Sequence, residues 1–177
     1  MKNRGLAKTD TGLIRALEHR RVRSEKAPAI KIKGGVFRDP TVCEGCGAVY
    51  TRKTWRRSGT RPLEALLRDA SWSVCPACAQ VKAGRFFGRV LLRGAFVPVH
   101  EEEFRRRVQH VAARAAFTEP ERRLVSWKRV DGGVEVKTTS QKLAHRIARE
   151  IEKAFRGKAS YSWSDRDGGL TATWERD

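Results

Sequence analysis

The sequence predicts an α+β fold built from a small cysteine-bearing unit and a separate domain of ββαββ type. Two closely spaced cysteine pairs mark the first unit, which we place at residues 40–99. Helical and strand periodicities alternate after residue 100 and mark the second, at residues 100–177. Residues 1–39 are basic and poor in apolar side chains, so we expect a partly disordered arm with one short helix at 11–23.

The cysteines carry the clearest chemical signal. Cys43 and Cys46 are separated by two residues, as are Cys75 and Cys78, and 28 residues lie between the pairs. A two-residue gap turns both thiolates of a pair toward one ion, and two pairs complete the tetrahedron that zinc prefers. The pattern therefore predicts a four-cysteine zinc ribbon with one structural Zn²⁺. Four thiolates close the coordination sphere, so we expect no metal-activated water.

Other uses of these cysteines fit the sequence less well. Two disulfides would need an oxidising compartment, and the chain begins without an apolar stretch of signal-peptide length. A redox dithiol is typically found beside a βαβ pattern, which is not visible here. No apolar run reaches the roughly 18 residues that span a bilayer. We expect a cytoplasmic protein that does not associate with membranes.

The charge indicates an anionic partner. The chain has 38 Lys and Arg against 20 Asp and Glu, a net charge of +18. Residues 1–99 contain 21 basic and 7 acidic residues, and residues 100–177 contain 17 and 13. The arm offers no bulky apolar face for insertion into a membrane surface. The sequence therefore favours nucleic acid as the partner.

Two segments are candidate nucleic-acid contacts. In the first, Arg52, Lys53, Arg56 and Arg57 surround Trp55 just after the first cysteine pair. We expect these cations to contact phosphates and Trp55 to stack on a base. Alternatively, Trp55 packs on the ribbon and only the cations face water.

The second segment is a helix expected at residues 141–156. Its basic side chains recur at intervals of three and four residues, which places them within about 80° on the face opposite its apolar residues. We define this set as the basic ridge, and it comprises Lys142, Arg146, Arg149, Lys153 and Arg156. The ridge could follow a phosphate backbone or be an ordinary solvated helix face.

The remaining elements complete the second unit. Two hairpins are expected, one on each side of the helix at 141–156, and a glycine-containing turn joins the two strands of each. Together they predict a sheet of about four strands. We expect Tyr161 and Trp163 to join Trp174 in the core beneath that helix. The expected ranges are a β-prone segment at 85–97 within the ribbon, a helix at 101–116, strands at 124–130 and 134–137, and strands at 161–164 and 170–175.

Catalytic patterns are missing from the sequence. The four histidines are scattered, and there is no Walker loop, no Gly-x-Ser-x-Gly and no His-Glu-x-x-His. The Gly132-Gly133 and Gly168-Gly169 pairs follow aspartates in expected hairpins, which is turn chemistry. We expect a protein that is not an enzyme and has no small-molecule substrate.

The order of motifs resembles a known group. The two cysteine pairs with Trp55 between them, the segment from Gly88 to Phe96, and the C-terminal segment from Val134 to Trp174 occur in this order. The chain resembles short bacterial zinc-ribbon proteins of a nonsense-mediated-decay-like group. Through them it is similar to the zinc-binding N-terminal region of the archaeal and eukaryotic adaptor for export of the large ribosomal subunit.

This resemblance implies metal ligation by Cys43, Cys46, Cys75 and Cys78 and binding to ribosomal RNA or a ribosomal particle. The further cysteine pairs and the long C-terminal region of the large adaptor are absent here, so nuclear export does not transfer. We therefore expect a non-enzymatic, ribosome-associated RNA-binding zinc protein. The alternatives are a DNA-binding zinc-ribbon transcriptional regulator and a zinc-ribbon protein-interaction module.

Overall fold

The structure is a computed structural model that describes residues 37–57, 68–165 and 168–177. These residues form four helices and two mixed β-sheets, so the expected α+β class is confirmed. Nearly all of the expected arm at residues 1–39, including its helix at 11–23, lies outside the described residues.

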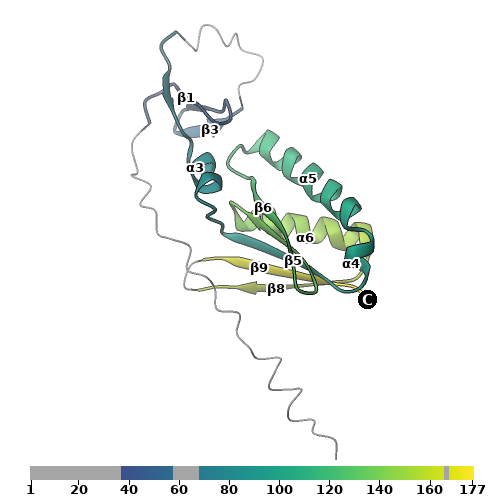
Figure 1. Ribbon diagram of the computed structural model, residues 1–177. Helices are drawn as coiled ribbons and strands as arrows, with labels where there is room; N and C mark the ends of the chain where they lie inside the picture. Colours follow the sequence, from purple (N-terminus) through teal and green to yellow (C-terminus); the bar gives the residue numbers. More distant parts are fainter. Residues whose placement is uncertain (1–36, 58–67, 166–167) are drawn as a thin grey trace, which may run out of the picture.

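The first sheet lies in the cysteine-bearing unit, for which we keep the name ribbon as a label, and has four short strands in the order β3-β2-β1-β4. β1 pairs antiparallel with β2 and parallel with β4, and a short helix, α3, follows β4. The unit forms one end of the molecule (Figure 1). The bounds are β1 (Thr41–Cys43), β2 (Val49–Thr51), β3 (Thr54–Arg56), β4 (Ser71–Ser73) and α3 (Pro76–Lys82).

The second sheet has five strands in the order β6-β7-β5-β9-β8. Its central strand, β5, runs parallel to β9, and every other neighbouring pair is antiparallel. The bounds are β5 (Gly88–Arg93), β6 (Leu124–Val130), β7 (Gly133–Thr138), β8 (Lys158–Trp163) and β9 (Leu170–Glu175).

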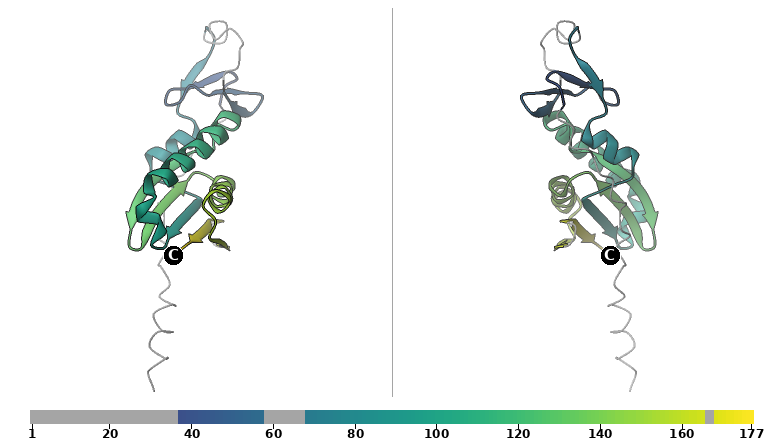
Figure 2. Two further views of the ribbon diagram at one scale, coloured as in Figure 1. Left: turned by 90° about the vertical axis from the view of Figure 1, so that its right-hand side faces the viewer. Right: turned by 90° about the vertical axis from the view of Figure 1, so that its left-hand side faces the viewer.

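Three helices belong to this second domain: α4 (Phe96–Val99), α5 (Glu101–Thr118) and α6 (Gln141–Phe155). The apolar stripes of α5 and α6 pack on one face of the sheet and share a single core with it (Figures 1 and 2). The C-terminal end of α5 points toward the ribbon unit. None of the helices in the described ranges has the length and apolar character needed to cross a bilayer.

Local signals explain where α6 begins and ends. Ser140 caps its start, because the Ser140 hydroxyl accepts a hydrogen bond from the Leu143 amide at 3.3 Å. At its end Arg156 and Gly157 adopt φ angles of 60° and 79°, which stop the helix. α6 approaches the sheet closely at Gly88, where a Cβ atom would lie 2.6 Å from the Ala144 Cβ.

The arrangement of the second domain differs from the expected ββαββ pattern in one strand. The pattern of residues 85–97 predicts a strand within the ribbon, but β5 lies in the second sheet between β7 and β9. In each of the two expected hairpins the inner strand, β7 or β9, has one edge without a partner. β5 pairs with both of these edges, and its Val90 and Leu92 side chains are buried in the core. The C-terminal part of the same segment forms α4, after Gly94 ends the strand with a φ of 102°.

Candidate metal centre and adjoining basic surfaces

The first cysteine pair lies in a tight turn at the end of β1. Cys43 is the last residue of the strand, its amide donates to the Ala48 carbonyl at 2.8 Å, and the Gly47 amide donates to the Cys43 carbonyl at 2.9 Å. Gly47 has a φ of 68°, which favours glycine. A Cβ atom at Gly45 would lie 3.1 Å from the Cys78 Sγ, so glycine there leaves room for the other pair.

The second pair lies at the start of α3. Cys75 is the N-cap residue of this helix, and its Sγ accepts a hydrogen bond from the Cys78 amide at 3.4 Å. Pro76 at the first helical position has the φ angle that a helix requires. The sequence between the two cysteines therefore forms a helix start that orients both sulfurs toward the first pair.

The four sulfurs form a compact cluster that fits one metal ion. All four Sγ atoms lie within 4.8 Å of one another, and the Cys43–Cys78 and Cys46–Cys75 sulfur pairs are each 3.8 Å apart. Sulfurs bound tetrahedrally at about 2.3 Å from zinc would be about 3.8 Å apart. All four cysteines are free of disulfides. The cluster expected from the sequence is confirmed as a site that could hold a single metal ion.

Burial raises the pKa of thiols in the cluster, and hydrogen bonds from backbone amides lower it. Burial raises the pKa of Cys75, and it raises the pKa of Cys78 to about 11. Burial has the same effect on Cys43, but backbone amides of Cys75 and Gly45 donate to its sulfur and lower its pKa to about 7. The Cys75 amide lies 3.2 Å from the Cys43 Sγ. Such amide donors stabilise the thiolate, which is the form that binds metal.

One charged neighbour of the cluster comes from the second domain. The Arg123 guanidinium donates from Nη1 to the Cys78 Sγ at 3.4 Å. Its Nε donates to the Pro120 carbonyl at 3.1 Å, and its amide donates to the Thr139 hydroxyl at 2.8 Å, so the side chain is well positioned. Arg123 follows Cys78 by 45 residues, and spacing patterns in the sequence give no indication of this contact.

The ring of Trp55 faces the interior of the ribbon. It is 5% exposed, and its centroid lies 5.0 Å from that of Phe37 and 5.4 Å from that of Tyr50. The ring is therefore unavailable for base stacking, and the alternative in which Trp55 packs on the ribbon describes its position. A single short strand places Trp55 inward and both neighbours outward, because side chains alternate between the faces of a strand.

The cations around Trp55 are exposed, and two of them form a hairpin tip. Thr51 pairs with Thr54, so Arg52 and Lys53 make a two-residue turn between β2 and β3. Their φ angles are 50° and 62°, as in a type I′ turn, where Asn-Gly is strongly preferred. The Asp39 carboxylate accepts a 2.7 Å hydrogen bond from the Arg52 amide. The tip therefore presents two cations in a backbone conformation that costs free energy for both residues.

The basic ridge on α6 is also exposed along its full length. All five of its cations are exposed, and the apolar residues on the opposite side of the helix are buried in the core. Lys153 lies 3.7 Å from Glu150 at the margin of the ridge. The predicted placement of these side chains on the solvent face is confirmed, and their role remains a proposal.

Two aromatic residues predicted to be buried lie on the surface. Tyr161 and Trp163 on β8 are 37% and 60% exposed, whereas Trp174 on β9 is fully buried as expected. Trp163 pairs with the buried Leu170, so its side chain points to the same face of the sheet as α6. Tyr161 and Trp163 therefore lie on the predicted face of the sheet, but the prediction that they are buried was wrong. β8 is an edge strand and α6 packs mainly over β5 and β9, so the helix covers Tyr161 only in part and leaves most of Trp163 exposed.

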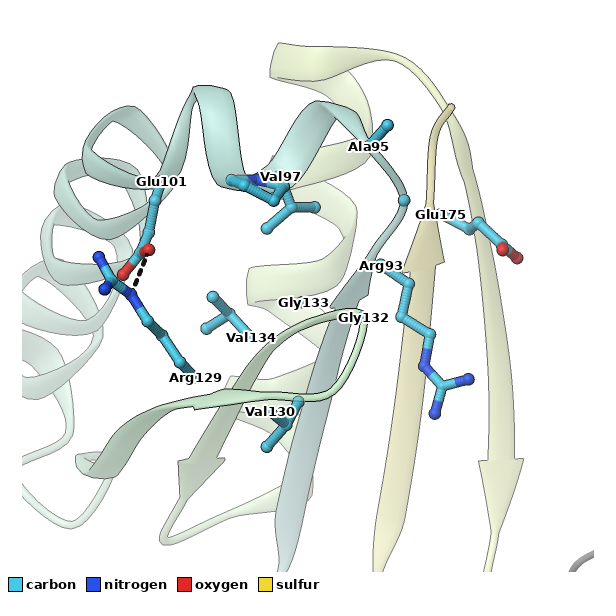
Figure 3. A pocket seen from close by; sticks show the side chains of 12 residues that line it. Arg93, Ala95, Val97, Glu101, Arg129, Val130, Gly132, Gly133, Val134 and Glu175 are labelled. Atoms are coloured by element: carbon cyan, nitrogen blue, oxygen red, sulfur yellow. Dashed lines mark hydrogen bonds and ion pairs between the residues drawn. The ribbon is translucent and has the colours of Figure 1, made fainter.

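A surface pocket lies at the end of the second domain that is farther from the ribbon, just beyond the C-terminal end of β5 (Figure 3). It is bounded by the β6–β7 turn at Gly132 and Gly133, and Arg129 reaches across it to Glu101 with a 2.7 Å ion pair. Arg93 and Glu175 contribute one further charge of each sign. The balanced charge sets this pocket apart from the two basic surfaces.

No protein-family model matches the chain, and no curated protein matches its sequence.

Proposed function

We propose that this is a zinc-binding, non-enzymatic protein that binds RNA and associates with ribosomal RNA or a ribosomal particle. The observation that carries the proposal is the hairpin tip of Arg52 and Lys53. Two exposed cations occupy turn positions at which Asn-Gly would be more stable. Unfavourable backbone conformations that persist at a surface are typical of functional sites.

Zinc is the metal that this donor set favours. Four thiolates at tetrahedral spacing are typical of structural zinc, although iron–sulfur centres also use four cysteines. Cys43 and Cys46 would hold the ion from the β1 turn, and Cys75 and Cys78 would hold it from the start of α3. The bound metal would join the two turns of the ribbon, a structural role that requires no chemistry at an open coordination position.

Two exposed basic surfaces support a polyanionic partner. The hairpin tip, together with Arg56 and Arg57, forms one, and the basic ridge of α6 forms the other. Lys and Arg contacts to phosphates supply affinity without sequence, so RNA shape would have to supply specificity. The ribosomal assignment rests on the resemblance of the ordered motifs to ribosome-binding zinc ribbons.

The proposal is tested by measuring the affinity of the zinc-loaded chain for a structured ribosomal RNA fragment and for a DNA duplex of equal length, across a range of salt. We expect tighter binding to RNA, weakened by Arg56→Glu with Arg57→Glu. That variant should also reduce the slope of log K against log salt by about 1 for each phosphate interaction that the substitutions remove.

The matched control is Arg106→Glu with Arg114→Glu. Both arginines are exposed on α5, and the two substitutions change the net charge by the same amount. This control should bind RNA nearly as well as the wild type. Equal loss in both variants, or tighter sequence-selective binding to duplex DNA, would contradict the proposal. In the second case the DNA-binding regulator becomes the better description.

A further inference from the structure

We infer that β8 and the adjoining face of α6 form a site for unpaired nucleotides of RNA, in which Tyr161 and Trp163 stack on bases and the basic ridge contacts the phosphates. This inference rests on the proposed RNA binding and specifies the kind of RNA segment bound. It assigns a role to the two aromatic rings that the core of the second domain does not use.

The two rings lie on the same side of one edge strand. Tyr161 pairs with Ala172 and Trp163 with Leu170, and both of these partners are buried beneath α6. Residues two apart on a strand are about 6.6 Å apart, so the two rings form a short row beside the helix. Exposed large apolar residues that occur as a pair at an edge indicate a contact surface, whereas isolated ones are common.

β8, which carries the two rings, runs antiparallel to α6 and lies alongside it. The Ala159 amide donates to the Glu152 carboxylate at 3.1 Å, the Tyr161 ring lies 4.9 Å from that of His145, and a Cβ atom at Gly168 would lie 3.5 Å from the Gln141 side chain. The two contacts from Ala159 and Tyr161, and the position of Gly168 beyond the end of β8, show that β8 lies alongside α6. Trp163 therefore lies level with the first turn of the helix.

The basic ridge of α6 lies next to Tyr161 and Trp163, on the side of the rings that faces solvent. At 100° per residue, Lys142, Arg146 and Arg149 lie about 60°, 100° and 40° around the helix from His145, all in the same direction. Partial burial and the charge of Glu152 raise the pKa of Tyr161, and Arg149 is close enough to the phenol to oppose them. Glu152, whose charge acts on the Tyr161 phenol, already accepts the Ala159 amide. A strand of phosphates along the ridge would therefore bring its bases toward the two rings.

This combination selects unpaired nucleotides over a duplex. Bases in a duplex stack on one another and offer no face to a protein ring, whereas bases in loops and single strands stack on aromatic side chains. A charged ridge alone would bind both forms, because both carry phosphates. The rings therefore give the site its preference for unpaired segments.

The test measures binding of the full zinc-loaded chain to labelled oligouridine of about twelve nucleotides and to an RNA duplex of equal length. We expect Tyr161→Ala with Trp163→Ala to weaken oligouridine binding by about tenfold or more, at low and at moderate salt, without changing the salt slope. Duplex binding should stay within about twofold of the wild type, since stacked bases do not reach the rings.

The matched control is Trp72→Ala. Trp72 is 58% exposed and lies on β4, an edge strand of the other sheet, so its removal deletes an equally exposed ring outside the site. It should leave oligouridine binding unchanged, and Trp163→Phe should restore most of the binding that Trp163→Ala loses. Because Trp163 is 60% exposed, Trp163→Ala alone should melt near the wild-type temperature, so unfolding would not explain weaker binding by this variant.

The outcomes separate this inference from the proposed function. If the wild type binds neither RNA, both are wrong. If it binds RNA and the Tyr161 and Trp163 variants bind oligouridine equally well, or if Trp72→Ala causes the same loss, only the site on β8 is wrong. Unchanged RNA binding combined with loss of self-association would instead make β8 an interface between copies of the chain.

Discussion

Arg123 donates a hydrogen bond from its guanidinium to the Sγ of Cys78 at 3.4 Å, and this contact links the second domain directly to the cysteine cluster. A cation beside a thiolate stabilises the charged form that a metal requires. The two units of the chain are therefore joined at one of the four cysteines, and we expect Arg123, which lies outside the ribbon, to contribute to metal binding.

Removing this cation should weaken metal binding. Arg123→Ala is expected to lower zinc affinity by about tenfold to a hundredfold, the usual cost of losing a hydrogen bond to a metal ligand. Competition with a chromogenic chelator measures this affinity. Arg122→Ala is the control, because Arg122 pairs with Glu119 at 2.7 Å and not with a sulfur. Equal affinities for the Arg123→Ala and wild-type proteins would contradict the coupling.

Removing the metal should unfold the ribbon and leave the second domain folded. The ribbon core consists of Cys43, Ala48, Trp55, Cys75 and Ala77, whereas the second core contains eighteen buried residues. So small a core needs the metal to remain folded. We expect elemental analysis to find one zinc per chain. Chelation should shift the indole N–H resonance of Trp55 to its unfolded position and leave that of Trp174 in place.

Elemental analysis and the Trp55 indole resonance of the Cys78→Ser variant distinguish the effect of metal loss from any direct effect of the chelator. This variant should purify with little zinc and show the unfolded Trp55 resonance without a chelator. A metal-free wild-type chain whose Trp55 resonance is unchanged would contradict a structural role for the metal.

Replacing the hairpin tip should increase stability and decrease RNA binding at once. Arg52→Asn with Lys53→Gly introduces the residues that a type I′ turn prefers and should raise the free energy of unfolding by about 1 kcal/mol. The variant loses two exposed cations, so RNA affinity should fall and the salt slope should flatten. Thermal melts and binding titrations measure the two effects.

The opposite signs of these effects exclude misfolding as the cause of weaker binding. A variant that is more stable and binds RNA as tightly as the wild type would show that the tip makes no phosphate contact. A variant that is less stable would show that the native side chains stabilise the turn.

The contribution of Glu101 to stability should depend on pH. Partial burial raises the pKa of this carboxyl, but hydrogen bonds from Arg129, Trp127 and Arg105 outweigh it and hold the pKa below its ordinary value. A carboxyl with a lowered pKa in the folded state stabilises the protein above its unfolded-state pKa and loses that effect as the pH falls through its folded-state pKa. Glu101→Gln should therefore lower the melting temperature at neutral pH.

The difference in melting temperature between the wild type and Glu101→Gln should shrink as the pH is lowered through the acidic range, because the wild-type carboxyl is then protonated as well. Thermal melts of both proteins between neutral and acidic pH measure it. A difference that is the same at all pH values would indicate that Glu101 acts through packing alone.

The parts of the fold that depend on local sequence could be predicted. The helix at Gln141–Phe155 follows from its apolar spacing, and the β6–β7 turn follows from Gly132 and Gly133. The cysteine cluster follows from cysteine spacing, because two Cys-x-x-Cys turns that face each other can be predicted without knowledge of the rest of the chain.

The parts that depend on which elements become neighbours could not be predicted. The alternation in β5 predicts a strand but does not identify β7 and β9 as its partners. The exposure of Trp163 depends on β8 being at an edge that α6 does not cover. The contact between Arg123 and Cys78 depends on how the two units pack. Each is a long-range relationship that periodicity within a segment does not encode.

The central claim is that the chain binds ribosomal RNA through cations arranged on a metal-held ribbon. Sedimentation of the tagged full-length protein from cell lysate, at low and moderate salt and with and without ribonuclease, tests it most directly. We predict that the protein migrates with a ribosomal subunit, remains there at moderate salt, and moves to the top of the gradient after ribonuclease treatment or when Arg56 and Arg57 are both replaced by Glu. Migration at the top of the gradient in untreated lysate at low salt would contradict the account.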